Sequence, residues 1–165
     1  MQRIILIALL SFLTLSSFAQ NKIGFIDSDE LIALMPENKA AETVLEEYGN
    51  SLTYQLESMA AQFEEKVNEF KANEATYTDR ITKDKMDEIS MLGQKIESFQ
   101  QNAQGLLQTK EQELFKPILL KVRRAIKDVA KENNFTCILD KSQGSVLYSI
   151  ESQSVLSLMK KKLGL

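Results

Sequence analysis

The side chains of this chain that could do chemistry are acidic and basic rather than nucleophilic. The sequence contains no histidine and a single cysteine, which excludes a Ser-His-Asp triad, a Cys-His pair and the usual zinc sites. Two pairs of adjacent carboxylates, Glu64-Glu65 and Asp87-Glu88, remain as candidates for general acid–base chemistry. That chemistry requires a shielded site that shifts a carboxyl pKa, whereas both pairs fall off the apolar positions of helical segments. We therefore expect no enzyme, no cofactor and no metal.

A basic cluster and the lone cysteine are the other chemical candidates. Nucleic-acid binding would require the cluster to lie in a basic domain with an aromatic or groove-reading element, so we expect no nucleic-acid partner. The cluster consists of Lys121, Arg123, Arg124 and Lys127. Cys137 lies in the apolar run Phe135 to Leu139. Free cysteine is among the most buried residue types, which favours burial, and an intermolecular disulfide is the alternative.

The first nineteen residues have the pattern of a secretory signal peptide. Arg3 precedes an apolar run from Ile4 to Leu15, and Ser17-Phe18-Ala19 places small residues at the −3 and −1 positions of a cleavage site before Gln20. The alternative is a membrane anchor, but the apolar run is short for a membrane span and polar residues follow it. Because no second long apolar run occurs, we expect no integral membrane insertion.

The middle of the chain predicts a long helical hairpin. No proline occurs between Glu37 and Lys116, and Tyr77 to Asp79 is the plausible break. Apolar residues of the first arm follow an eleven-residue repeat, at Leu45, Tyr48, Leu52, Leu56, Met59, Phe63, Val67 and Phe70. Those of the second arm follow a heptad, at Ile89, Leu92, Ile96, Phe99, Ala103 and Leu106. Arms of roughly 40 residues would each reach about 60 Å, and such arms leave apolar side chains in need of a partner.

Short apolar segments on both sides of the hairpin predict a small β body, and the fold class is α+β. Lys22 to Asp27 is the first expected strand, and Pro36 ends a short helix that follows it. Phe135 to Leu139 and Ser145 to Ser149 are expected to form a β-hairpin. Pro117 should kink the second long helix, either where arm joins body or as a surface bend without a role. The expected division is a signal peptide over residues 1–19, a body of residues 20–36 and 117–165, and an arm of residues 37–116.

The charge is unevenly placed along the chain. Between Asn38 and Lys110 there are eight Lys/Arg and thirteen Asp/Glu, whereas between Leu114 and Leu165 there are ten Lys/Arg and four Asp/Glu. The distribution predicts two solvated surfaces of opposite sign. The alternative is that these surfaces steer a charged client or a membrane surface.

The order of elements resembles the Skp/OmpH family of periplasmic outer-membrane-protein chaperones. The resemblance is carried by Lys22 to Asp27, by Ala130 to Asp140 with Val146-Leu147-Tyr148, and by the closing Lys161 to Leu165. It implies a homotrimer in the periplasm, with a body of about three strands per subunit and three projecting hairpins. It also implies an ATP-independent holdase that binds unfolded outer-membrane proteins. The known members resembling this fold have basic arms that suit lipopolysaccharide, whereas these arms are acidic, so no such site is assigned.

The resemblance assigns two groups of site residues. The arm lining expected to hold clients is Met59, Phe63, Phe70, Tyr77, Met86, Met91 and Phe99. For any one of them, packing of arm against arm is the alternative. The trimerisation body is expected to use Ile23, Phe25, Ile26, Phe135, Cys137, Ile138, Leu139, Val146 and Tyr148. The rival function is a trimeric structural or adaptor protein of the cell envelope with one fixed partner.

Overall fold

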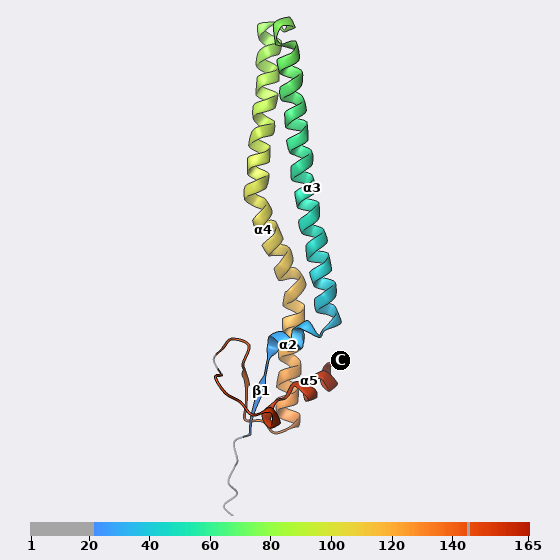
Figure 1. Cartoon of the computed structure of the whole chain (residues 1–165), viewed down its shortest axis with the longest axis vertical. Coiled ribbons are helices and arrows are strands. Elements are labelled where there is room, and N and C mark those ends of the chain that lie inside the picture. Colours follow the sequence, from blue (N-terminus) through green and yellow to red (C-terminus); the bar gives the residue numbers. More distant parts are fainter. Residues whose placement is uncertain (1–21, 145) are drawn as a thin grey trace, which may run out of the picture. The chain divides into compact units, whose positions relative to one another are not determined.

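The computed structural model describes residues 22–144 and 146–165, so the predicted signal peptide lies outside the described residues. The chain is mostly helical with one small sheet (Figure 1). The elements are β1 (Ile23–Ile26), α2 (Ser28–Ala33), α3 (Pro36–Asn73), η1 (Glu74–Thr76), α4 (Asp79–Glu132), β2 (Cys137–Asp140), η2 (Glu151–Gln153) and α5 (Leu156–Leu163). They divide into a hairpin unit, Ile32–Arg124, and a strand unit whose described residues are 22–31, 125–144 and 146–165.

The hairpin unit consists of α3 and most of α4, which lie side by side as antiparallel helices (Figure 1). Pro36 occupies the first turn of α3, where a missing N–H costs nothing. The predicted break is confirmed, because η1 and Tyr77-Thr78 separate the two helices. α4 continues through Pro117 as one helix of 54 residues. The proline therefore does not end the helix.

The apolar seam between α3 and α4 follows the predicted positions in the first arm and departs from them in the second. All eight predicted α3 positions are buried or half-buried. In α4 the heptad fails after Ala103, because Leu106 is exposed and Leu107 faces Gly49 instead. A straight α-helix has 3.6 residues per turn, so a 3.5-residue repeat drifts off the contact line and the seam must shift by one residue. The prediction for Leu106 is wrong.

The strand unit contains a two-stranded parallel sheet. β1 pairs with β2 in the register Ile23↔Cys137 to Ile26↔Asp140. Parallel strands require a long crossover, and the hairpin helices supply it in sequence. The predicted β-hairpin is wrong for the single chain, since the described residues 146–150 contain no strand. The other edge of β1 instead meets the chain before α5, where Phe25 bridges Ser154 and its carbonyl accepts the Val155 N–H at 2.9 Å.

The core of the strand unit is built by α2, α4, α5 and one face of the sheet. Its most buried apolar side chains are Ile26, Leu31, Ala125, Val129, Val155 and Met159. The expected stop of α4 at Asn133-Asn134 is confirmed, because Asn134 adopts φ 55° and turns the chain out of the helix. Lys22 stabilises this turn. Its Nζ donates a hydrogen bond to the Asn133 carbonyl at 2.9 Å and lies 4.2 Å from the centroid of the Phe135 ring.

Candidate interaction surfaces

One face of the sheet is apolar and exposed among the described residues. The parallel register places Ile23 and Phe25 on the same face as Cys137 and Leu139. Ile23, Cys137 and Leu139 are exposed, and Phe25 is half-buried. We call these four residues the open sheet face. The expected burial of Cys137 therefore does not occur within the single chain. Alternation along β2 sends its thiol to the side opposite the core, and the sequence does not reveal which side is covered.

The opposite face of the sheet belongs to the chain's own core. Gly24 and Ile26 are buried and Ile138 is half-buried on this side. A Cβ on Gly24 would lie 2.7 Å from Val155 Cγ1, so only glycine fits there without a shift of its neighbours. Of the residues assigned to the trimerisation body, Ile26 is thus already buried inside the single chain.

The remaining residues assigned to the body lie after β2 or beside Lys22. Phe135 and Val146 are half-buried, whereas Tyr148 is exposed. Leu147, which the assignment did not include, is 98% exposed. An alternating strand would place Leu147 on the side opposite Val146 and Tyr148. Leu147 and Tyr148 are thus the exposed apolar side chains of residues 146–148.

Asp140 ties the end of β2 to the start of α2. Its carboxylate accepts hydrogen bonds from the Ser28 N–H at 3.1 Å, the Ser28 hydroxyl at 2.5 Å and the Ser142 N–H at 3.0 Å. Partial burial tends to raise the pKa of Asp140, but the hydrogen bonds from Ser28 and Ser142 outweigh it and the pKa is lowered. The ionised carboxylate is thus a structural acceptor at this corner.

The residues assigned to the arm lining fall into two groups. Met59, Phe63, Phe70, Tyr77 and Phe99 are half-buried. Phe63 lies beside Gly93, and the Phe70 and Tyr77 rings are 6.1 Å apart, so both contacts hold the hairpin together. Met86 and Met91 are instead 56% and 63% exposed. These two methionines are available to a partner without any change in the hairpin.

Sequence reasoning missed several exposed apolar side chains of the hairpin unit. They include Tyr54, Ile81, Leu119 and Leu120, and Leu106, which was assigned to the seam, is exposed as well. All of them lie at positions that interrupt or flank the apolar repeat of their helix. A departure from the repeat is the sequence signal that could have identified them as exposed. A surface helix normally places polar residues at such positions, so these side chains leave apolar area of the hairpin unit exposed to solvent.

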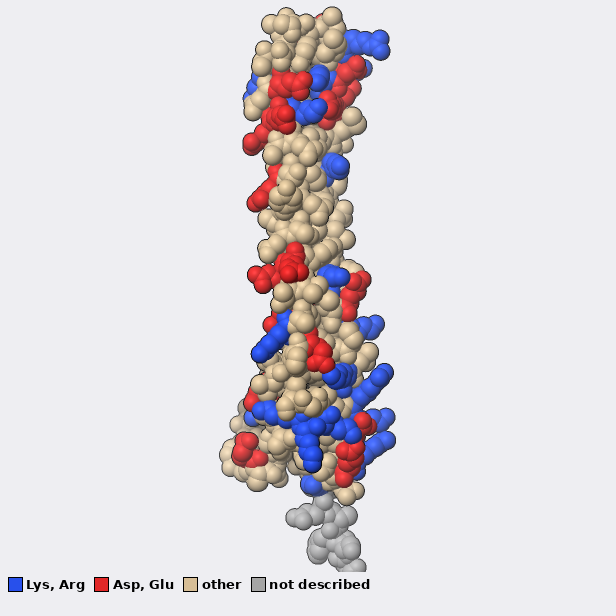
Figure 2. All heavy atoms as spheres, turned by 90° about the vertical axis from the view of Figure 1, so that its right-hand side faces the viewer, with Lys and Arg blue, Asp and Glu red and all other residues tan. Residues whose placement is uncertain are grey.

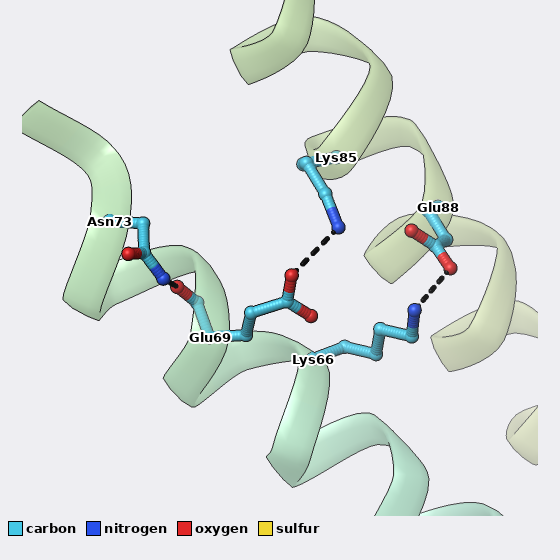
Figure 3. Close-up of polar contacts among 5 residues, drawn as sticks. All are labelled: Lys66, Glu69, Asn73, Lys85 and Glu88. Atoms are coloured by element: carbon cyan, nitrogen blue, oxygen red, sulfur yellow. Dashed lines mark hydrogen bonds and ion pairs between the residues drawn. The ribbon is translucent and has the colours of Figure 1, made fainter. Parts of the chain in front are cut away.

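Ion pairs hold the two helices together near the tip of the hairpin, as Figure 3 shows. Lys66 Nζ lies 2.7 Å from a Glu88 oxygen, and Lys85 Nζ lies 2.9 Å from a Glu69 oxygen. Hydrogen bonds within these pairs raise the pKa of Lys66 and of Lys85 and lower the pKa of Glu88. Glu88 therefore forms an interhelical ion pair with Lys66.

The middle of the hairpin is almost uncharged. Glu57 is the charged residue between Tyr48 and Gln62, and Glu97 is the charged residue between Ile96 and Thr109. These stretches oppose each other, as the approach of Leu107 to Gly49 indicates. Figure 2 shows both signs of charge on the face it draws, with wide uncharged areas between them. The middle of the hairpin is thus nearly uncharged, and the acidic excess of the arm lies toward its two ends.

Two negative findings concern the described residues. They contain no group of three or more His, Cys, Asp or Glu placed to hold a metal ion. Among the helices of residues 22–144 and 146–165, none combines the length and apolarity needed to cross a membrane.

A long antiparallel helical hairpin, joined to a small unit with a parallel strand pair and exposed apolar surface, defines the class of fold to which the protein belongs. The family model described as outer membrane protein (OmpH-like) matches residues 22–163, and the chain belongs to this family. A crystal structure of a candidate outer membrane chaperone (OmpH-like) from Caulobacter crescentus CB15 is similar, with a TM-score of 0.77 and 12% identity. The match covers 88% of this chain and 85% of that one. No curated protein matches the chain.

Proposed function

We propose that the protein is an ATP-independent periplasmic holdase that binds unfolded outer-membrane proteins and prevents their aggregation. The observation that carries the proposal is the exposure of apolar side chains along the hairpin helices, above all Met86 and Met91. Methionine is flexible and polarizable, so it adapts to varied partners better than branched residues do. Membership of the OmpH-like family and the chaperone name of the similar structure support the same function.

Self-association is part of this proposal, with a homotrimer as the assembly. The open sheet face supports it, because a two-stranded sheet is marginal alone and Ile23 and Leu139 leave apolar area exposed to solvent. Strand edges and the exposed Leu147 and Tyr148 offer further surface for a neighbouring copy. Export directed by residues 1–19 brings the protein to the periplasm, where its clients pass.

An aggregation assay tests the holdase directly. An unfolded β-barrel membrane protein is diluted from urea, and its light scattering is followed with and without a several-fold excess of this protein. We expect protection by the wild type. Replacing Met86, Met91 and Leu106 by serine should remove most of it, since each well-covered side chain contributes about 1.5–3 kcal/mol, and less in a loose complex.

A matched control separates loss of apolar surface from damage to the helix. Gln94, Gln100 and Gln104 are exposed on the same helix, and replacing all three by serine should preserve protection. Circular dichroism should show unchanged helix content in both triple variants. If the wild type gives no protection, the proposed holdase function is overturned. The remaining candidate function is then that of an adaptor with one fixed partner.

A further inference from the structure

The methionines of the described residues differ in how far solvent reaches them. Met35 and Met159 are completely buried, and Met59 is half-buried in the seam of the hairpin. Met86 and Met91 are instead 56% and 63% exposed, and both lie in the part of α4 that follows the hairpin tip. A small oxidant in solution therefore reaches two thioethers directly, while the methionines of the core are shielded from it.

Exposed methionine undergoes a defined reaction with peroxide. The thioether sulfur takes up one oxygen atom from hydrogen peroxide and is oxidised by two electrons, while the peroxide is reduced to water. The product, methionine sulfoxide, is polar, whereas the thioether is apolar and polarizable. The phenylalanine side chains of the arm lining contain no sulfur and do not undergo this reaction. Peroxide therefore changes the polarity of the arm surface at its exposed methionines.

Oxidation at these two positions leaves the contacts of the hairpin in place. Ile89 is a half-buried seam residue of this stretch, and Met91 lies about 200° around the helix from it at 3.6 residues per turn. The ion pairs drawn in Figure 3 join α3 and α4 over the same stretch. Because Met86 and Met91 are exposed, water can hydrate a sulfoxide oxygen at either position. The modified chain should therefore keep its helices.

We propose that Met86 and Met91 form an oxidation site at which peroxide weakens client holding without unfolding the hairpin. The inference rests on the proposed holdase function and adds a covalent, reversible modification of its binding surface. A client that covers an oxidised methionine must remove water from the sulfoxide oxygen, and burying a polar group without a hydrogen-bond partner is unfavourable.

The expected loss of holding is partial. Exposed apolar side chains of the hairpin unit that contain no sulfur are unchanged by the reaction, and they include Tyr54, Leu106, Leu119 and Leu120. Client holding depends on the summed apolar area that the client covers. Oxidation should therefore weaken it several-fold and not abolish it.

Peptide mass spectrometry after treatment with hydrogen peroxide maps the site. We expect Met86 and Met91 each to gain one oxygen atom at least about tenfold faster than Met35 and Met159, because the buried sulfur atoms are out of contact with solvent. Equal rates at all four positions would overturn the assignment of the site.

The aggregation assay measures the effect on holding. The concentration of oxidised wild type that gives half-maximal protection should be about threefold or more above that of the untreated protein, because the sulfoxides disfavour client contact. Circular dichroism should show unchanged helix content. Methionine sulfoxide reductases for both epimers of the sulfoxide should restore the protection.

A matched variant separates this site from other oxidisable groups. Met86→Leu with Met91→Leu keeps apolar side chains of similar volume and helix propensity but removes both thioethers. Treated and untreated samples of the variant are compared with each other, so any effect of leucine itself cancels. Met59 and Cys137 remain in this variant, and peroxide should leave its protection unchanged.

The outcomes that would overturn the inference are distinguishable from failure of the proposed function. Untreated wild type that gives no protection removes the holdase and this effect with it. Wild type that protects equally before and after complete oxidation of Met86 and Met91 removes the inference and leaves the holdase. An equal loss in the leucine variant assigns the effect to Met59 or Cys137 and overturns the inference as well.

Discussion

Ser28 and Asp140 are 112 positions apart, and the N–H and hydroxyl of Ser28 both donate to the Asp140 carboxylate. The contact joins the last residue of β2 to the first residue of α2. It fixes the parallel strand pair at the end where β1 leads into α2. Removing Asp140 should therefore loosen the strand unit.

Asp140→Ala is expected to destabilise the protein by about 1–3 kcal/mol near pH 7, because the Ser28 and Ser142 donors lose their acceptor. The folded-state pKa of Asp140 lies below its ordinary value of 3.8. The stabilisation is therefore present above pH 3.8 and is lost as the pH falls through the folded-state pKa. Urea denaturation at about pH 7 and about pH 3 measures it, and the difference from wild type should shrink at the lower pH. Glu151→Gln, an exposed control, should change little, and an equal loss at both pH values would contradict the charge-based account.

Gly24 and Gly105 should respond to alanine in opposite directions. A Cβ at Gly24 would lie 2.7 Å from Val155 Cγ1, whereas nothing lies within 4 Å of one at Gly105. Gly24→Ala should destabilise by about 1–3 kcal/mol through overpacking, and Gly105→Ala should stabilise α4 by about 0.5–1 kcal/mol. Thermal unfolding checks both. Combining Gly24→Ala with Val155→Ala should recover part of the loss if the clash is its cause, and no recovery would refute it.

Cys137 reports whether the open sheet face is covered in the assembled protein. It is exposed in the single chain, so coverage by a second copy should slow its reaction with a maleimide. Leu139→Asp places a charge on the same face and should accelerate the reaction about tenfold or more by disrupting assembly. Leu165→Asp is the control, since both leucines are 40% exposed and Leu165 lies outside the sheet. Equal rates in wild type and Leu139→Asp would mean that the face is not an interface.

The ion pairs near the hairpin tip should limit its local opening. Lys66→Glu places like charges beside Glu88 and should accelerate amide exchange in peptides covering residues 66–88. Adding Glu88→Lys should restore protection. The difference should largely vanish at about 1 M salt, where the Debye length is about 3 Å. Exchange that is unchanged at low salt would show that the Phe70–Tyr77 contact and the seam hold the tip without help from charge.

Local patterns in the sequence were sufficient for the hairpin. Apolar steps of three and four residues identified eight α3 positions that are all shielded, and the Tyr77 to Asp79 break and the Asn133-Asn134 stop were predicted correctly. These features depend on helix periodicity and on residues that end helices, which act over a few positions. Composition alone excluded whole classes of catalytic site, because a chain without histidine cannot form them.

Only the tertiary structure decided which segments that are distant in the sequence lie next to each other. Strand propensity could not state that Ile23–Ile26 pairs in parallel with Cys137–Asp140, nor that the chain at Ser154 takes the other edge of β1 in place of residues 146–149. An alternating strand has two faces, and the sequence alone does not say which one the chain covers itself, so the exposure of Cys137 in the single chain was not predicted. At Leu106 and Leu107 the drift of a 3.6-residue helix against a heptad moved the seam by one position. Each of these outcomes depends on which distant segment of the chain packs against the residue. Short-range periodicity does not identify that segment.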